Sequence, residues 1–161
     1  MRIFRSSITL AALLVCGAAA HAQSSWPDFM PTLEPAASKS PVAAVVLPDA
    51  KVEPPAADVP ADKARWSGRW SGWVCRAYAC DTKLVVEKVS AADATIVYAF
   101  ASASVAPFTT RASAQFVGDE LHATLPNGAK LKYRMRSSGD VVEFHYQQGR
   151  DWATGILSRE K

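Results

Sequence analysis

Few residues of this 161-residue chain have side chains and spacings suited to catalysis or metal binding. His122 and His145 are the histidines that lie beyond the apolar leading segment. Each alternates with apolar neighbours in a predicted strand, which places them on the polar face beside Arg134 and Lys132 respectively. No G-x-S-x-G motif or phosphate-binding glycine loop is present, and two histidines on separate strands are too few ligands for a metal site. We therefore expect no catalytic residue, no metal and no cofactor, and a protein that is not an enzyme.

The clearest candidate for a binding surface is a row of basic side chains at every second position of one predicted strand. The row consists of Lys130, Lys132, Arg134 and Arg136. One interpretation is a solvated outer face whose charges discourage edge-to-edge aggregation. The functional interpretation is a stripe that attracts an anionic component of the cell envelope, such as a phosphate-rich glycan, an acidic protein or a lipid headgroup. Both interpretations stay open at this point.

A second candidate is the segment WSGRWSGWVCRAYAC, which contains three tryptophans. Glycines stand two residues before and two residues after Trp70, leaving room for its ring, so we predict that Trp70 is structural. Trp66 stands at the start of this strand, where we expect it to be partly exposed. Trp73 falls on the opposite, polar face close to Tyr78, and these two residues are candidate contacts for a ligand or partner.

The same segment contains Cys75 and Cys80, the two cysteines that remain after the leading segment is removed. An even number of cysteines in an exported chain predicts a structural disulfide. The alternatives are half of a metal site or a redox pair. Both are disfavoured, because no second cluster of cysteine and histidine exists and the spacing is not C-x-x-C.

The N-terminal part of the chain predicts export followed by a tether. Residues 1–22 have the features of a secretory signal peptide, with Arg2 and Arg5 before an apolar run and an A-x-A cleavage site at its end. Residues 23–63 are rich in proline and alanine and predict a disordered linker. The expected location is periplasmic or secreted, with no transmembrane segment after cleavage.

Charge separates the linker from the domain that follows. Residues 23–62 contain two basic and six acidic side chains (−4), whereas residues 63–161 contain fourteen and nine (+5). The predicted domain, residues 64–161, is therefore mildly basic. This excess is too small to indicate a nucleic-acid partner.

Short alternating runs between turn signals predict that this domain is all-β. Seven or eight sequential strands with short connections predict a small antiparallel up-and-down β-barrel. A barrel of this size is filled by its own side chains or holds one small ligand. The expected strands lie over residues 65–75, 82–89, 94–101, 104–116, 121–125, 130–136, 141–147 and 152–158.

Two strand registers follow from keeping apolar residues on one face. Pairing Met135 with Val142 also sets Tyr133 opposite Phe144. For the preceding hairpin, a two-residue turn at Asn127-Gly128 would put apolar residues on the basic face. We therefore expect a longer loop over residues 126–130, or a bulge, and the pairs Leu125–Leu131, Ala123–Tyr133 and Leu121–Met135.

Gly68-x-Trp70 at the start of an all-β meander resembles the first-strand motif of the calycins, the lipocalin and avidin-type barrels. The resemblance implies that Trp70 closes one end of the barrel and packs against a basic residue of the last strand. Arg159 is placed to be that residue. Gly68, Trp70 and Arg159 are thus the expected barrel-closing set.

A second resemblance is to small periplasmic inhibitors of c-type lysozyme, through residues 113–116 and 128–133. We expect a binding module for a small ligand or an anionic envelope partner. The alternatives are an inhibitor of an envelope-directed enzyme such as lysozyme, and an accessory domain related to hydrolase fusions.

Overall fold

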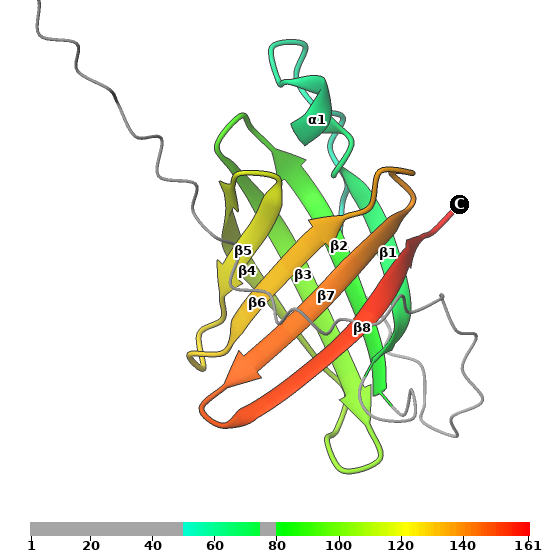
Figure 1. Cartoon of the computed structure of the whole chain (residues 1–161), viewed down its shortest axis with the longest axis vertical. Coiled ribbons are helices and arrows are strands. Elements are labelled where there is room, and N and C mark those ends of the chain that lie inside the picture. The colour runs from blue at the N-terminus through cyan, green and yellow to red at the C-terminus, as the bar shows by residue number, and fades with distance from the viewer. Residues whose placement is uncertain (1–49, 75–79) are drawn as a thin grey trace, which may run out of the picture. The chain divides into compact units, whose positions relative to one another are not determined.

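The computed structural model describes residues 50–74 and 80–161, and its eight strands form one closed barrel (Figure 1). Every strand pairs antiparallel with its neighbours in sequence, and β8 pairs with β1. This confirms the predicted all-β, up-and-down barrel. The strands are β1 (Gly68–Val74), β2 (Cys80–Val89), β3 (Asp93–Ser102), β4 (Phe108–Val117), β5 (Glu120–Thr124), β6 (Lys130–Met135), β7 (Val141–Gln148) and β8 (Asp151–Arg159).

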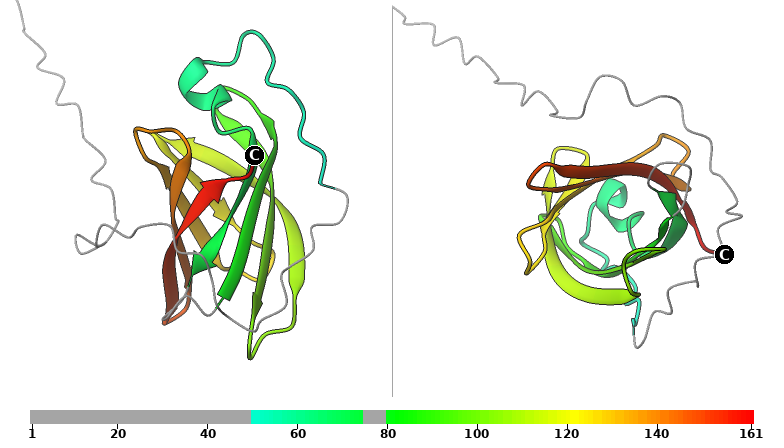
Figure 2. Two further views of the ribbon diagram at one scale, coloured as in Figure 1. Left: turned by 90° about the vertical axis from the view of Figure 1, so that its right-hand side faces the viewer. Right: turned by 90° about the horizontal axis from the view of Figure 1, so that it is seen from below.

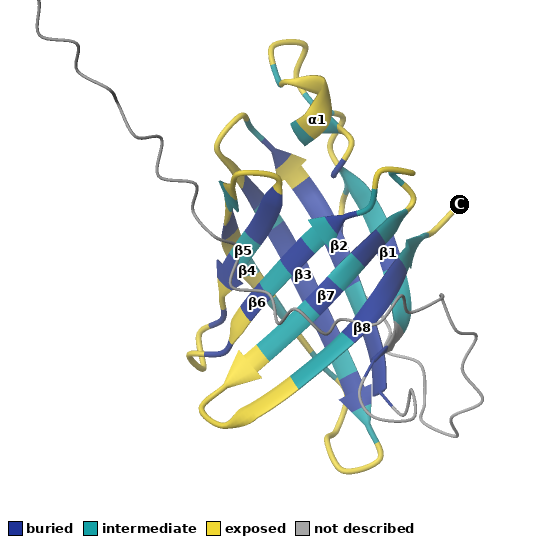
Figure 3. Cartoon of the chain, viewed as in Figure 1, coloured by how far each residue is buried: buried dark blue, intermediate teal, exposed yellow. Residues whose placement is uncertain are grey.

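Strand formation follows from the alternation of apolar and polar residues. In β6, Leu131, Tyr133 and Met135 are buried in the barrel, while the basic residues between them face outward. The exposed strand ends and loops include the turn between β7 and β8 (Figure 3). In the described part of the chain, no helix is long and apolar enough to cross a membrane.

The register between β6 and β7 is the one that the sequence predicts. Met135 pairs with Val142 and Tyr133 with Phe144. The outward pair Lys132–His145 follows from the same alignment. Burying one consistent apolar face is therefore sufficient to set this register.

The predicted register between β5 and β6 is wrong by two residues. Leu121 pairs with Tyr133 and Ala123 with Leu131, where the prediction had Met135 and Tyr133 as the respective partners. A shift of two residues keeps every side chain on its expected face, so the burial pattern alone could not detect it. One consequence is that His122 lies opposite Lys132 and not opposite Arg134.

The cause is the tight loop between these strands. The Leu125 amide donates to the carbonyl of Ala129 at 2.8 Å, leaving only three residues in the loop. Gly128 adopts a φ of +81°, which suits glycine, and the Ala129 amide donates to Asn127 Oδ1. Leu125 and Ala129 are both buried, so the short loop also keeps the apolar face intact.

Residues 50–53 form a strap across the outside of the barrel, although the sequence predicts them to be part of the disordered linker. Ala50 is buried against Val85 and Val97, and Val52 packs on the same group. The strap continues into the short helix α1 (Ala61–Ala64). The described residues that contact the barrel thus begin at residue 50, not at the expected boundary of 64.

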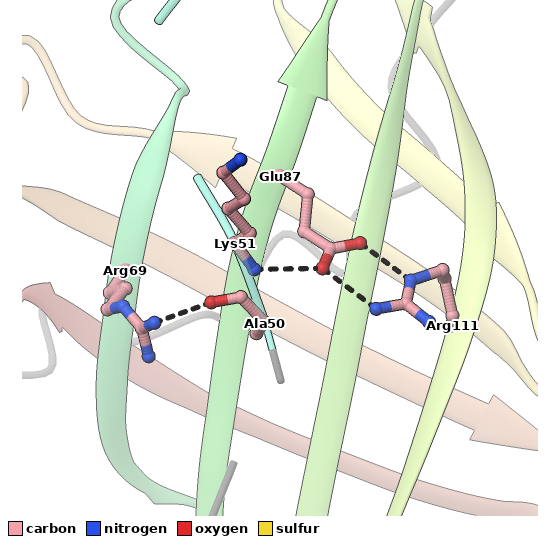
Figure 4. A network of polar contacts seen from close by, with 5 residues as sticks. All are labelled: Ala50, Lys51, Arg69, Glu87 and Arg111. Carbon is pink, nitrogen blue, oxygen red and sulfur yellow. Dashed lines mark hydrogen bonds and ion pairs between the residues drawn. The ribbon is translucent and has the colours of Figure 1, made fainter. Parts of the chain in front are cut away.

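Polar contacts fix the strap where β2 contains an irregularity in its pairing with β3 (Figure 4). The Glu53 amide donates to the main-chain carbonyl of Glu87 at 2.7 Å, and the Lys51 amide donates to Glu87 Oε1 at 3.2 Å. Arg111 donates to both carboxylate oxygens of Glu87, at 2.7 and 2.9 Å. On the other side, Arg69 donates to the carbonyl of Ala50 at 2.6 Å. The bulged residue Glu87 is therefore the main anchor of the strap.

One end of the barrel is closed by α1 and the residues after it; seen along the barrel, α1 lies within the outline of the strands (Figure 2). Trp66 is 1% exposed, so the expectation of partial exposure is wrong; its ring packs edge-on against Phe116. Lys63 donates to the carbonyl of Gly118 at 2.6 Å and lies over the Phe116 ring. We call this closed end the plug end.

The residues expected to close the barrel lie together at the plug end. The guanidinium of Arg159 lies 4.0 Å from the centre of the Trp70 ring and donates to the carbonyls of Ser67 and Arg65. A Cβ at Gly68 would come within 2.7 Å of the same guanidinium. The glycine therefore makes room for Arg159 and not, as expected, for the Trp70 ring.

Candidate ligand-binding cavity

The opposite end of the barrel contains a cavity of about 330 Å³. It lies where β3, β5 and β7 end and β4 and β8 begin, far from α1 along the strands (Figure 1). We call this the open end. Its lining is formed by Tyr98, Phe100, Val105, Phe108, Asn127, Phe144, Tyr146, Gln148, Asp151, Trp152 and Ala153.

Aromatic rings form most of the cavity wall. Tyr98 is central, because its ring lies 6.4 Å from Phe100, 6.0 Å from Phe108 and 6.0 Å from Phe144. The rings of Phe100 and Phe108 are 5.9 Å apart and tilted. These distances are typical of favourable aromatic pairs. The rings give the cavity a largely apolar lining.

Polar groups occupy one side of the cavity, along the turn from β7 to β8. Tyr146 donates from its hydroxyl to Gln148 Oε1 at 2.6 Å, and Gln148 donates through Nε2 to the carbonyl of Asn127 at 3.0 Å. Asp151 pairs with Gln148 across the turn. Burial raises the pKa of Tyr146, and the negative charge of Asp151 raises it further. The polar side of the cavity thus includes one acidic side chain, that of Asp151.

Exposed apolar side chains stand at the mouth of the cavity. Trp152 is 61% exposed and Val105 is 42% exposed, and both belong to the lining. Soluble domains usually cover side chains of this size, and contiguous exposed ones indicate a contact surface. The mouth therefore combines exposed apolar side chains with polar ones.

Two buried hydroxyls lie in the barrel interior. Tyr133 packs at 5.3 Å against Phe144, a lining residue, and Thr82 belongs to β2. Neither hydroxyl has a hydrogen-bond partner within residues 50–74 and 80–161. Burial, and then the proximity of Tyr98, raises the pKa of Tyr133 well above its usual range, so its hydroxyl keeps its proton.

The four basic side chains of the predicted stripe face outward, away from the cavity. Two of them pair with carboxylates of the neighbouring strands. Arg134 donates to Glu120 Oε1 at 2.5 and 3.1 Å, and Arg136 donates to Glu143 at 3.2 Å. Lys130 is exposed, and Lys132 stands between His122 and His145. Much of the positive charge that defined the stripe in the sequence is thus paired within the fold.

Both histidines belong to this outer face. A 2.8 Å hydrogen bond joins His122 Nε2 to Glu120, a carboxylate that is almost fully buried. Partial burial, and next the charge of Lys132, lowers the pKa of His145. Among the described residues, no group of three or more His, Cys, Asp or Glu is placed to hold a metal ion.

Several predicted site residues lie outside what the structure describes. Cys75 and Tyr78 belong to residues 75–79, and the side chain of Trp73 is likewise not described. Cys80 begins β2 and is buried. The disulfide between Cys75 and Cys80, and the contact role of Trp73 and Tyr78, stay predictions.

The cavity residues are not recognisable as a site from the sequence. Phe144 and Tyr146 fall on the inward face of their predicted strand, where they look like ordinary core residues. A usable signal was nevertheless present, because aromatic residues gather at one end of several predicted strands: Tyr98 and Phe100 near the end of one, Phe108 near the start of the next. In an up-and-down barrel these positions meet at the same end.

No protein-family model matches this chain, and no curated protein matches it. Among solved structures, the chain is similar to EF1p2_mFAP2b, whose structure is described as bound to DFHBI, with 15% sequence identity and a TM-score of 0.45. The similar region covers 60% of this chain and 94% of that chain. A similarity this weak says nothing about the function of this protein.

Proposed function

We propose that this protein is a non-catalytic binding module that holds one small, largely apolar ligand in the cavity at the open end. The observation that carries the proposal is an aromatic-walled cavity of about 330 Å³ with a few polar groups on one side. Small-molecule sites in proteins usually combine these features, and volumes of roughly 300–1,000 Å³ are typical.

The closed plug end supports the same proposal. Trp66 and Trp70 are fully buried at one end of the barrel, where Arg159 lies over the Trp70 ring. The other end keeps a cavity although an eight-stranded barrel is narrow enough to be filled by its own side chains. Trp152 and Val105, both exposed, belong to the described lining of this cavity.

The row of basic residues on the outside of the barrel is a less favourable binding site than the cavity. Arg134 and Arg136 already pair with Glu120 and Glu143, so an anionic partner would have to displace those carboxylates. The carboxylates would then lose their partners, which costs free energy for a group as buried as Glu120. We therefore assign the binding role to the cavity.

The neutral solvatochromic dye prodan tests this proposal. Its fluorescence should shift to the blue on binding, with a Kd on the order of 10 μM for a ligand of this size. Ala153→Phe fills the cavity from β8 and should abolish the shift. Thr154→Phe adds the same ring at the next residue, on the outer face, and should leave it intact.

Circular dichroism of both variants would show whether each is folded. Absence of a blue shift in the wild-type protein, or equal binding by the two folded variants, would contradict a ligand site in the cavity.

The proposal includes export to the periplasm or the exterior. It is supported by the signal-like composition of residues 1–22, with basic residues before an apolar run and an A-x-A site. Expression of the full chain in a Gram-negative host should yield a mature N-terminus at Gln23 in the periplasmic fraction, read by N-terminal sequencing. An unprocessed chain in the cytoplasm would contradict this part.

A further inference from the structure

The charges around the cavity are one-sided. Among the eleven lining residues in the described part of the chain, Asp151 carries the one acidic side chain, and none is lysine, arginine or histidine. The domain as a whole has an excess of basic residues, so the cavity differs in sign from the protein around it. The sign of the charge in the lining affects which ligands the cavity can bind.

The aromatic wall adds to the same preference. The face of an aromatic ring carries partial negative charge and attracts a cation within about 6 Å of the ring centre. Tyr98, Phe100 and Phe108 line the cavity with their ring centres 5.9 to 6.4 Å apart, and Tyr146 lies close enough to Asp151 to be influenced by its charge. Aromatic walls with a carboxylate at the rim are suited to organic cations.

An anionic ligand, by contrast, finds no basic partner among the described residues of the lining. Burying a carboxylate without a partner is strongly unfavourable, and the charge of Asp151 would oppose it. The nearby basic residues Lys130 and Arg150 are exposed and outside the lining. A ligand with a negative charge is therefore disfavoured.

We propose that the ligand is a small organic cation, with its flat or apolar body among the rings of Tyr98, Phe100 and Phe108 and its charged nitrogen near Asp151. This inference rests on the proposed cavity-binding function and gives the chemical class of the ligand. It reverses the expectation of an anionic partner, which was based on the outward-facing basic row.

Three probes of similar size and different charge test the inference: N-methylquinolinium (cation), 2-naphthol (neutral) and 2-naphthoate (anion). Isothermal titration of the wild-type protein should give a Kd about tenfold lower for N-methylquinolinium than for 2-naphthol, because ring faces and a carboxylate both favour the cation. Binding of 2-naphthoate should be the weakest of the three.

Asp151→Asn keeps the size and polarity of the side chain and removes its charge. It should abolish the advantage of N-methylquinolinium and leave the Kd of 2-naphthol within about twofold, since the neutral probe does not depend on the charge. Asp119→Asn is the matched control, because Asp119 is exposed in the β4–β5 turn near the plug end. It should change none of the three Kd values.

The possible outcomes separate the two proposals. If no probe binds the wild-type protein, the proposed cavity-binding function fails, and this inference fails with it. If all three bind with similar Kd values, or Asp151→Asn leaves the preference for the cation unchanged, the cavity binds ligands but the assignment to cations is overturned.

Discussion

The hydroxyl of Tyr133 is fully buried, and no residue in the described part of the chain forms a hydrogen bond with it. Removing such a group from water without compensation costs about 1–3 kcal/mol. The ring itself packs well, at 5.3 Å from Phe144. The hydroxyl therefore lowers the stability of the protein, while the ring raises it.

Tyr133→Phe should accordingly raise the free energy of unfolding by about 1 kcal/mol, because it removes the unsatisfied hydroxyl and keeps the ring. Urea denaturation followed by tryptophan fluorescence measures this change. Tyr146→Phe is the control, since its hydroxyl lies at the more open mouth and bonds to Gln148, and it should not stabilise the protein. A loss of stability in Tyr133→Phe would show that the hydroxyl has a partner in solution.

At the scale of elements, Glu87 holds the strap with both its side chain and its main chain. Glu87 accepts hydrogen bonds from Arg111 and from the Lys51 amide, and its main chain accepts one from Glu53. The hydrogen bonds and charge of Arg111, together with the Lys51 amide, lower the pKa of Glu87 below 4.5, although burial partly opposes them. Folding thus favours the charged form of Glu87.

A carboxylate whose pKa is lowered by folding stabilises the protein above its unfolded pKa, and this contribution is lost as the pH falls through the folded pKa. The contacts between the strap and Glu87 should therefore be intact above pH 4.5 and weaken progressively below it. Chemical shifts of the Lys51 and Glu53 amides, followed by NMR between pH 6 and pH 3, measure this. Glu87→Gln has no carboxylate to protonate, so the Lys51 amide shift should lose its dependence on pH over this range. A profile identical to that of the wild type would contradict the role of Glu87.

Most elements were predictable from the sequence, because alternation of apolar and polar residues determines both the strands and their inward faces. The β6–β7 register followed from two mutually consistent faces. The β5–β6 register did not, since a shift of two residues preserves the faces and only the loop geometry at Gly128 distinguishes the alternatives. Loop geometry depends on hydrogen bonds that composition does not reveal.

The strap was not predicted, because residues 50–53 resemble the proline-rich linker and lack strand-like alternation. The signal for the strap is in the barrel sequence. Val85 and Val97 are apolar residues at outward-facing positions, so another segment has to pack over them to bury them. The cavity was missed for a similar reason. Its rings come from separate strands, and each ring alone is indistinguishable from a core residue.

At the scale of the whole barrel, closure depends on the close approach of β1 and β8. A Cβ at Gly72 would lie 2.0 Å from the carbonyl oxygen of Ile156, which is main chain and cannot move independently. A Cβ at Gly155 would lie 2.2 Å from Val74 on the same seam. Glycine is therefore required where the first and last strands meet.

Gly72→Ala should destabilise the barrel by more than the roughly 1–3 kcal/mol typical of overpacking, because main-chain atoms must separate. Ser71→Ala, at the adjacent residue of β1, should cost less than about 1 kcal/mol. Thermal unfolding measures both. Equal melting temperatures for the two variants would mean that the seam has room for a side chain.

A ligand should enter the open end of the barrel, and NMR titration with N-methylquinolinium tests this directly. The indole N–H signal of Trp152, at the mouth, should shift in proportion to binding, together with the amides of Phe100 and Phe108. The indole signals of Trp66 and Trp70, at the plug end, and the amides of Lys132 and Arg134 should stay unchanged. Shifts confined to β6 or to the plug end, or no shifts at all, would contradict the central claim.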